Sequence, residues 1–388
     1  MSAHGPHGPA HVPALDGLRG IAILSVFVFH LSWVLSPAHA TTHAAREVTL
    51  AGWVGVDLFF VLSGYLVTSG LTSSRPTREG IPCFLARRAL RILPLYYAVL
   101  IVGALLTRRT DVWHWVYLQN YALPFAADPR GFTAHFWSLA VEEQFYLFWP
   151  FVLVGLASLT PKARVFAVLG LWSAVVLVRT GLVLGLPHVM DGYDAAKLIY
   201  RATPTRLDGL LAGAAVALAQ RENGSALAFL RRARRPLGFF VVLGLAVLAM
   251  TIGVGHEDRR FEIFGYPLLA IGFAIVLSAA LDGALPGWVL EPLRGRFLGY
   301  AGTRSYGLYV FHWPFIAWIA PKLEIAHRVT SEREAWGLAV GAAACLVLAT
   351  GATAEASYRW LERPFLSLKD RISRAPRCAA TSHTNPSG

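Results

Sequence analysis

Four ionisable side chains stand out because they fall inside long apolar runs of the sequence. Arg19 and His30 are eleven residues apart, close to three helical turns, so a helix places both on one face. Asp57 and Glu142 lie in later runs. Such a group costs about 2.5–3.5 kcal/mol at the centre of a membrane helix and usually marks a functional path. A neutral imidazole is a natural general base, so we expect His30 to accept a proton, with Asp57 or Glu142 orienting its ring.

Each of these positions also has a structural interpretation. His30 would pack inside a helix bundle and bond a hydroxyl, and Asp57 would form a salt bridge between helices. The adjacent acids Glu142 and Glu143 are harder to explain by packing, so we count both as catalytic candidates, although they point about 100° apart on a helix. Ser138 shares the helical face of Glu142 and is either a helix cap or a contact for substrate.

Arginines near the third apolar run suggest an anionic ligand. Arg88 and Arg91 are three residues apart and share a helical face. Guanidinium groups fork onto phosphate oxygens, so a nucleotide-like or CoA-like ligand on the cytoplasmic side is plausible. A topology signal or a contact with lipid headgroups is the alternative for this pair.

Two more polar clusters are candidates for binding substrate. Arg206 and Asp208 head the sixth apolar run, at its outer mouth in the topology given below. Ser305, Tyr309 and His312 repeat at i, i+4 and i+7, so they share one helical face. Each cluster alone would be structural, but together they describe a polar interior in a chain that otherwise avoids polarity.

Composition defines the environment of these residues. Apolar residues make up 55% and charged residues 15% of the 388 residues, and the mean hydropathy is +0.50. These values exclude a disordered chain, a coiled coil and an ordinary soluble enzyme. The net charge of +12 does not indicate nucleic-acid binding, because the charges fall mostly in short loops. The three cysteines have no Cys-x-x-Cys spacing, so we expect no metal site.

The chain is therefore predicted to be an all-α, polytopic membrane protein with about ten transmembrane helices. A bilayer core of ~30 Å requires about 20 apolar residues per helix. We expect the transmembrane domain to cover 15–366, between disordered tails at 1–14 and 367–388. The predicted helices are 16–36, 52–71, 91–107, 137–158, 165–186, 205–220, 236–255, 263–281, 299–320 and 336–356.

Lys and Arg residues orient this domain. With the N-terminus inside, the inner segments carry 21 of the 35 Lys and Arg residues and the outer segments carry 12. The positive-inside rule then places both termini in the cytoplasm. The first run, followed by Ala38-His39-Ala40, also resembles a cleavable signal peptide, but the many later spans favour a retained anchor.

Taken in order, these motifs resemble the membrane acyltransferase 3 family of bacterial O-acyltransferases. Arg19 and His30 match the Arg-x10-His signature of the family, and the resemblance covers about residues 14–366. The further matches are Gly55-Val-Asp57-Leu-Phe-Phe-Val-Leu-Ser63-Gly64, Arg88-x-x-Arg91-Ile-x-Pro94, Trp137-Ser-Leu-x-x-Glu142-Glu-x-Phe-Tyr, Ser305-Tyr-x-Leu-Tyr309-x-x-His312-x-Pro314 and Glu362-Arg-Pro364-Phe.

The resemblance implies an enzyme of the bacterial cytoplasmic membrane that transfers an acyl group from acyl-CoA to a hydroxyl. Acyl-CoA is then a co-substrate, and no tightly bound cofactor is expected. The implied acceptor is a surface polysaccharide or glycolipid sugar, or a macrolide antibiotic or its sugar. The resemblance also implies His30 as the catalytic base and Arg19, Arg88 and Arg91 as contacts for the CoA phosphates. Membrane lipid is the other expected partner.

Two other classes of protein use similar residues. A proton-coupled transporter also buries His, Asp and Glu as a proton relay, but it more often has paired halves or repeated broken helices, which we do not find here. A multi-span glycosyltransferase would use a lipid-linked sugar and acidic residues in an outer loop, for which Asp191 and Asp194 are a faint match.

Overall fold

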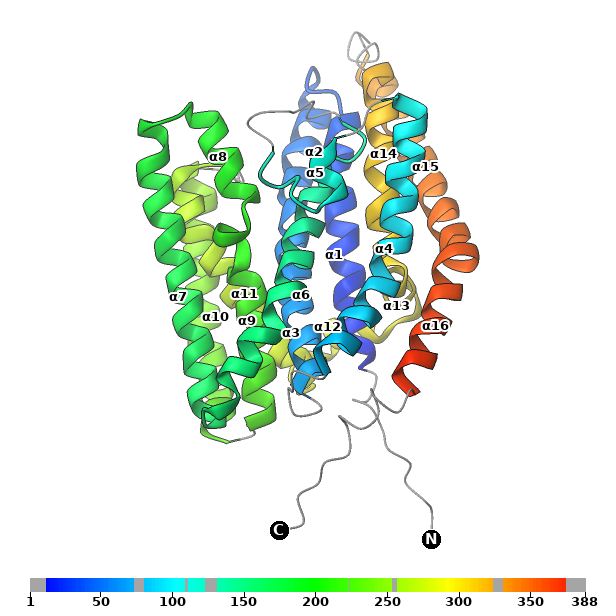
Figure 1. Cartoon of the computed structure of the whole chain (residues 1–388). Coiled ribbons are helices and arrows are strands. Elements are labelled where there is room, and N and C mark those ends of the chain that lie inside the picture. Colours follow the sequence, from blue (N-terminus) through cyan, green and yellow to red (C-terminus); the bar gives the residue numbers. More distant parts are fainter. Residues whose placement is uncertain are drawn as a thin grey trace.

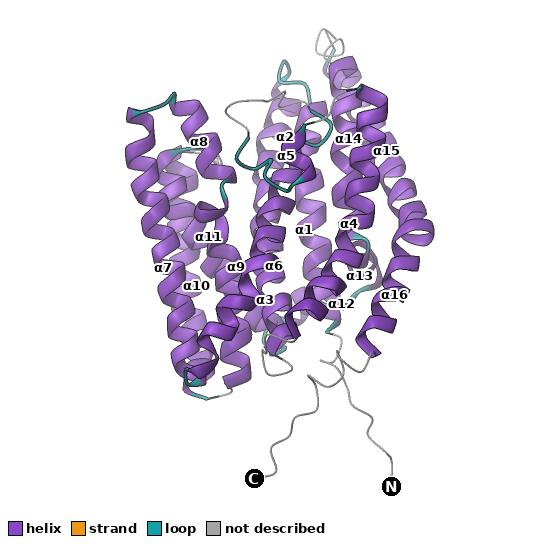
Figure 2. Ribbon diagram, in the orientation of Figure 1, coloured by secondary structure: helices purple, strands orange, loops and turns teal. Residues whose placement is uncertain are grey.

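The structure is a computed structural model, and it describes residues 12–72, 80–108, 111–122, 131–222, 224–252, 257–323 and 331–374. Within these ranges every regular element is a helix, as Figure 2 shows. The α-helices are α1 Pro13–Leu31, α2 Ala40–Leu50, α3 Gly55–Thr72, α4 Gly80–Thr107, α5 Val112–Trp115, α6 Trp137–Gly155, α7 Pro161–Gly185, α8 Gly192–Arg201, α9 Thr203–Glu222, α10 Ser225–Ile252, α11 Tyr266–Leu281, α12 Gly287–Arg294, α13 Arg296–Thr303, α14 Ser305–Leu323, α15 Glu332–Ser357 and α16 Arg363–Arg374.

Eight helical segments in the described ranges are long and apolar enough to cross a membrane, which confirms a polytopic membrane protein. They are Pro13–Val34, Ala40–Thr72, Gly80–Thr107, Ala134–Ser158, Pro161–His188, Ser225–Thr251, Phe261–Leu281 and Glu332–Leu368. The predicted stretches 205–220 and 299–320 correspond to α9 and α13–α14, which are not in this set. Both carry the polar clusters noted above, and these lower their apolar character.

Several predicted boundaries are wrong, and polar residues explain the difference. α4 begins at Gly80 rather than at 91, and α10 begins at Ser225 rather than at 236, so the arginines before each apolar run are helical. The predicted helix 299–320 is divided at Arg304 into α13 and α14. Apolar patterning marks where a helix meets lipid, but backbone hydrogen bonding continues beyond that region.

The expected tails fall largely outside the described residues. Two parts of them are helical, because α1 begins at Pro13 and α16 continues to Arg374. In Figure 1 the start of α1 and the end of α16 lie at the same end of the bundle. We call this the inner end. The opposite, outer end carries α2, α5 and α8.

α9 is the central helix on one side of the bundle, where it packs against α3, α7 and α11. Every residue from Asp208 to Ala219 is buried. Two glycines allow the backbones of α3 and α9 to touch. A Cβ on Gly64 would lie 1.9 Å from the carbonyl oxygen of Leu210, and a Cβ on Gly213 would lie 1.9 Å from that of Val61. Because lipid provides no hydrophobic driving force between helices, close van der Waals packing at small residues stabilises such crossings.

We expect Gly213→Ala to lower the stability of the bundle by roughly 1–3 kcal/mol, because the added methyl group forces α3 and α9 apart. Thermal unfolding in detergent measures the effect. The matched control is Gly181→Ala in α7, where nothing lies within 4 Å of the added Cβ. An equal melting temperature for both variants would show that the α3–α9 contact is not tight.

Candidate active site

The inner end of the bundle encloses a cavity of about 480 Å³. Its walls come from the start of α1, most of the length of α3, the first half of α4, the first half of α6 and the start of α14. Four arginines line it: Arg19, Arg87, Arg88 and Arg91. The structure thus brings together the three arginines expected to bind phosphate and adds Arg87. We call this space the inner cavity.

Neighbouring side chains hold these arginines in place. The Nη2 atom of Arg19 donates to Ser305 Oγ at 3.0 Å, and its Nη1 atom lies 3.9 Å from a carboxylate oxygen of Asp16. The Arg88 guanidinium lies over the ring of Tyr146, 4.7 Å from its centroid. α4 supplies three of the four arginines because this helix extends beyond its apolar run toward the inner end. Arg87, Arg88 and Arg91 therefore project from adjacent turns.

Glu142 faces the inner cavity, where it accepts a hydrogen bond from the hydroxyl of Tyr146 at 3.1 Å. Ser63 bonds the same hydroxyl. Glu143 does not line the cavity, and its buried Oε1 atom has no hydrogen-bond partner among the described residues. Among the described residues, the lining therefore carries four arginines against the two acids Asp16 and Glu142, and this excess of positive charge suits a phosphate-bearing ligand.

Ser138 and Tyr309 also line the inner cavity. Their side-chain oxygens lie 2.5 Å apart, and the Tyr309 hydroxyl donates to the carbonyl oxygen of His135 at 2.9 Å. Because Ser138 is on α6 and Tyr309 is on α14, this contact joins the two helices at the cavity wall.

Three buried or half-buried imidazoles follow Ser138 and Tyr309 toward the outer end. His312 Nε2 lies 3.2 Å from His30 Nδ1, and the ring of His135 lies 5.0 Å from that of His312. Neither ring nitrogen of His135 makes a hydrogen bond within the described residues. Nowhere among the residues that the structure describes is a group of three His, Cys, Asp or Glu side chains arranged to hold a metal ion. We call these three rings the histidine cluster.

Backbone carbonyls assign the proton positions in the cluster. His312 Nδ1 lies 2.6 Å from the carbonyl oxygen of Tyr309, and His30 Nδ1 lies 2.9 Å from that of Val26. A carbonyl only accepts, so each Nδ1 atom carries the hydrogen when the ring is neutral. His312 Nε2 then accepts from His30, and His30 Nε2 has the free lone pair that a general base requires.

The predicted partner of His30 is wrong. Asp57 does not contact His30; its Oδ1 atom lies 2.6 Å from Arg206 Nη2, with both side chains buried. Glu142 is held by Tyr146 at the inner cavity. His312, which we expected to contact substrate, instead occupies the orienting position. The sequence indicated that His30 and His312 face an interior, but it did not indicate that the two faces meet.

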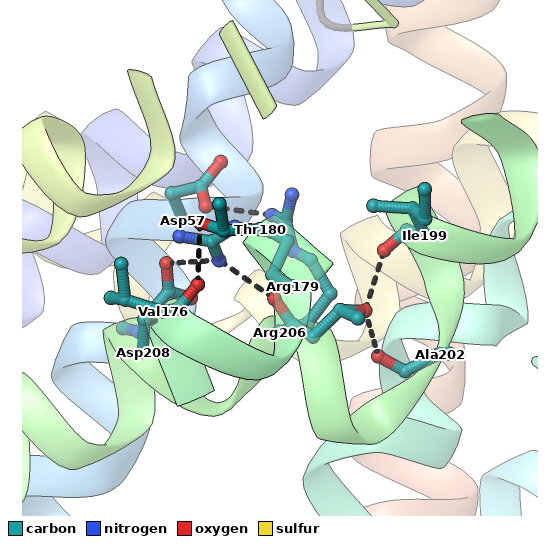
Figure 3. Close-up of polar contacts among 10 residues, drawn as sticks. Asp57, Val176, Arg179, Thr180, Ile199, Ala202, Arg206 and Asp208 are labelled. Carbon is teal, nitrogen blue, oxygen red and sulfur yellow. Dashed lines mark hydrogen bonds and ion pairs between the residues drawn. The ribbon is translucent and has the colours of Figure 1, made fainter. Parts of the chain in front are cut away.

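Arg206 and Asp208 do not lie at an outer mouth either. Arg179 Nη1 lies 2.7 Å from Asp208 Oδ2, and these two residues join Asp57 and Arg206 in the buried cluster of Figure 3. None of the four lines either cavity. The Arg206 guanidinium also lies 4.0 Å from the ring centroid of Tyr266. An arginine inside an apolar bundle requires a counter-ion, so the pairing is structural. We call this set the four-residue ion cluster.

A second, larger cavity of about 1740 Å³ lies toward the outer end. The end of α4, α5, the residues just before α6 and the second half of α14 supply its lining. Asp111, His114 and Thr133 are among these residues, and the sequence analysis did not select them. They lie in short segments without helical periodicity, and only their polar types amid aromatic neighbours offered a signal. We call this space the outer cavity.

Breaking one pair of the four-residue ion cluster tests its structural role. We expect Asp57→Asn to destabilise the protein by about 3–5 kcal/mol, because it leaves Arg206 charged and unpaired in the bundle. The control is Asp258→Asn, which breaks an exposed pair with Arg260 and should change stability by about 0–1 kcal/mol. Thermal unfolding in detergent measures both. Unchanged melting with complete loss of turnover in Asp57→Asn would instead restore a catalytic role.

Comparison with known proteins identifies the family. The model of the acyltransferase 3 family, described as an acyltransferase domain, matches residues 12–354. A peptidoglycan O-acetyltransferase (OatA) of Listeria monocytogenes is 28% identical over 91% of the chain, which covers 56% of that protein. The putative peptidoglycan O-acetyltransferase YrhL of Bacillus subtilis is 31% identical over 91% of the chain, which covers 55% of that protein.

A putative O-acetyltransferase of Staphylococcus aureus is 27% identical over 92% of the chain, which covers 57% of that protein. The chain thus spans little more than half the length of these relatives. No solved structure matches. By homology the protein belongs to the bacterial cytoplasmic membrane, which it crosses several times. The matched family model and the arginine and histidine positions agree, and the chain belongs to the acyltransferase 3 family of membrane O-acyltransferases.

Proposed function

We propose that the protein transfers an acyl group from acyl-CoA to a hydroxyl of a cell-wall sugar. The observation that carries this proposal is the inner cavity, where four arginines meet on the side of the bundle that Lys and Arg counts assign to the cytoplasm. Guanidinium groups bind phosphate in fork geometry, and acyl-CoA presents its phosphates from the cytosol. The acyl group, at the other end of the pantetheine arm, would then extend toward Ser138 and Tyr309.

His30 is the base in this proposal. Its Nε2 lone pair takes the proton of the acceptor hydroxyl, whose oxygen attacks the acyl carbonyl. The new oxygen–carbon bond replaces the carbon–sulfur bond, and the CoA thiolate leaves and is protonated. His312 is a positioning residue: together with the Val26 carbonyl it holds the His30 ring through Nδ1, at 3.2 Å and 2.9 Å.

The acceptor is proposed from the relatives. Two of them are named peptidoglycan O-acetyltransferases, which favours an acetyl group and a peptidoglycan sugar for this chain as well. These names give no support to an antibiotic acceptor, which we do not retain. Membership of the acyltransferase 3 family also replaces the transporter and glycosyltransferase alternatives.

We infer ten membrane crossings in residues 15–366, with both termini in the cytoplasm. α9 and α14 have 20 and 19 residues, long enough to cross a bilayer, and they pack against helices of the apolar set. The start of α1 and the end of α16 lie at the inner end, which agrees with an even number of crossings. The charge asymmetry of the loops supports the orientation.

We expect His30→Ala to reduce turnover by about 10²–10⁴-fold, because the general base is lost. Purified protein in lipid nanodiscs, supplied with acyl-CoA and peptidoglycan fragments, provides the assay, and thermal unfolding verifies the fold. His188→Ala removes an exposed histidine near the outer end and is the matched control. Near-normal turnover in a folded His30→Ala protein would overturn the proposed mechanism.

We expect the double variant Arg88→Gln/Arg91→Gln to raise the KM for acyl-CoA more than it lowers kcat, because phosphate binding is weakened in ground and transition states alike. Arg232→Gln/Arg235→Gln removes two exposed arginines of α10 and controls for net charge. If kcat falls with unchanged KM, these arginines do not hold the donor.

A further inference from the structure

The outer cavity differs from the inner cavity in charge. Among the residues that the structure describes, its lining contains no Lys or Arg. Most of it is apolar and includes six Trp and Phe side chains, and its polar residues are Thr107, Asp111, His114, Gln119, Thr133 and Thr353. An uncharged, hydroxyl-bearing ligand with apolar faces fits such a lining, because aromatic rings cover the faces and a few polar groups fix the orientation.

Three of these residues form one hydrogen-bonded row. Asp111 Oδ2 lies 3.2 Å from His114 Nδ1, and Thr133 Oγ1 lies 3.0 Å from His114 Nε2. The carboxylate only accepts, so His114 Nδ1 carries the hydrogen of the neutral ring. Nε2 then presents a lone pair to the Thr133 hydroxyl. A nucleophile bonded to a base, itself oriented by an acid, is the arrangement of activated hydroxyl catalysis.

The surrounding residues hold this row in place. Asp111 Oδ1 accepts from the backbone N–H of Trp113, which leaves Oδ2 for His114. Tyr96 on α4 donates from its hydroxyl to the carbonyl oxygen of His114 at 2.8 Å. Helix capping accounts for Asp111 but not for Thr133, which lies on the far side of the imidazole and comes from the segment before α6.

Burial lowers the pKa of His114 below its ordinary value. The ring is therefore neutral at physiological pH and able to accept a proton. The carboxylate of Asp111 opposes this shift but does not outweigh it.

The row also lies near the histidine cluster. Trp313 Nε1 donates to the carbonyl oxygen of Gly131 at 2.9 Å, two residues before Thr133. The ring of the same tryptophan lies 4.8 Å from that of His30. One side chain thus contacts both the segment that carries Thr133 and the proposed base.

We propose that Thr133 Oγ is an acyl carrier on the outer side, activated by His114 and Asp111, between acyl-CoA and the sugar acceptor. This inference rests on the proposed function and divides its direct transfer into two transfers, with a covalent intermediate and a second base. Asp111 is a positioning residue, because it acts through His114.

The two transfers balance. In the first, the Thr133 hydroxyl gives its proton to His114 Nε2, Oγ bonds the acyl carbon, and the carbon–sulfur bond breaks. The CoA thiolate leaves and takes a proton from water. In the second, His30 Nε2 takes the proton of the sugar hydroxyl, whose oxygen attacks the acyl carbon. The ester bond to Thr133 breaks, His114 returns its proton to Oγ, and His30 releases its own to water.

The experiment uses the full chain in nanodiscs with acetyl-CoA carrying a radioactive acetyl group. The protein is quenched within one turnover without acceptor, digested and mapped by mass spectrometry. We expect one ester-linked acetyl group on residue 133 in the wild type and in Thr133→Ser. We expect no acetyl group in Thr133→Val, and slower labelling in His114→Gln and Asp111→Asn. Thr251→Val, on the outer surface of α10, is the isosteric control.

Acceptor transfer is then measured on the same variants. We expect Thr133→Val to lose transfer by at least 10²-fold while Thr133→Ser retains it. Transfer at the wild-type rate in Thr133→Val, or a labelled wild type with its acetyl group elsewhere, overturns the carrier. If Thr133→Val does not fold, the position of the acetyl group in the wild-type protein decides whether Thr133 is the carrier.

His30→Ala separates this inference from the proposed function. We expect this variant to label residue 133 but not to pass the acetyl group to the acceptor. Normal transfer by His30→Ala would remove the proposed base and leave the carrier standing. If transfer depends on His30 but residue 133 carries no acetyl group, the carrier is overturned and the proposed base stands.

Discussion

The four-residue ion cluster is the constraint on which the bundle depends. Arg206 and Arg179 each bring a guanidinium into the bundle, and Asp57 and Asp208 neutralise them at 2.6 Å and 2.7 Å (Figure 3). One pair joins α3 to α9 and the other joins α7 to α9, and the close α3–α9 contact at Gly64 and Gly213 lies seven residues further along each of these two helices. Paired charges in an apolar interior tolerate little displacement, so they fix the register of these helices.

With the register fixed on this side, the proposed catalytic residues lie mainly on the other helices. α1, α4, α6 and α14 line the inner cavity together with α3, and the histidine cluster comes from α1, α14 and the residues just before α6. α1 contacts both α3 and α14. The arginines collect where α4 extends below its apolar run, and the imidazoles collect between the two cavities. The described residues therefore divide the interior into an inner part lined by arginines and an outer part lined mainly by apolar side chains with the carboxylate of Asp111, an arrangement that suits a donor bearing phosphates and a sugar acceptor.

The relatives of this chain are longer than the chain itself. The chain aligns with the three relatives described over at least 91% of its own length, but it covers only 55–57% of theirs. The part matched by the family model, residues 12–354, contains the inner cavity and the histidine cluster. Transfer of an acyl group from a cytosolic donor to an outer acceptor requires a route through this shared part, and an acyl carrier in the outer cavity would shorten the distance that the acceptor must penetrate.

The sequence determined the class of the protein and the identity of several interior residues. Apolar runs define membrane helices, and the 3.6-residue period places Arg19 with His30 and Tyr309 with His312 on shared faces. These properties depend only on residues near one another in the chain. It also singled out Arg19, Arg88 and Arg91, which the structure places together at the inner cavity. The helix ends were less well predicted, since helical hydrogen bonding extends past the apolar region.

Only the tertiary structure decided which faces meet. Asp57 and Arg206 are 149 positions apart, and His30 and His312 are 282 apart, so no local pattern indicated that these residues are partners. Asp57 was therefore assigned to the wrong partner, and Arg206 and Asp208 to the wrong role. Asp111, His114 and Thr133 come together from two short segments without periodicity. Contacts between distant segments depend on how helices pack, and the packing is set by the whole bundle.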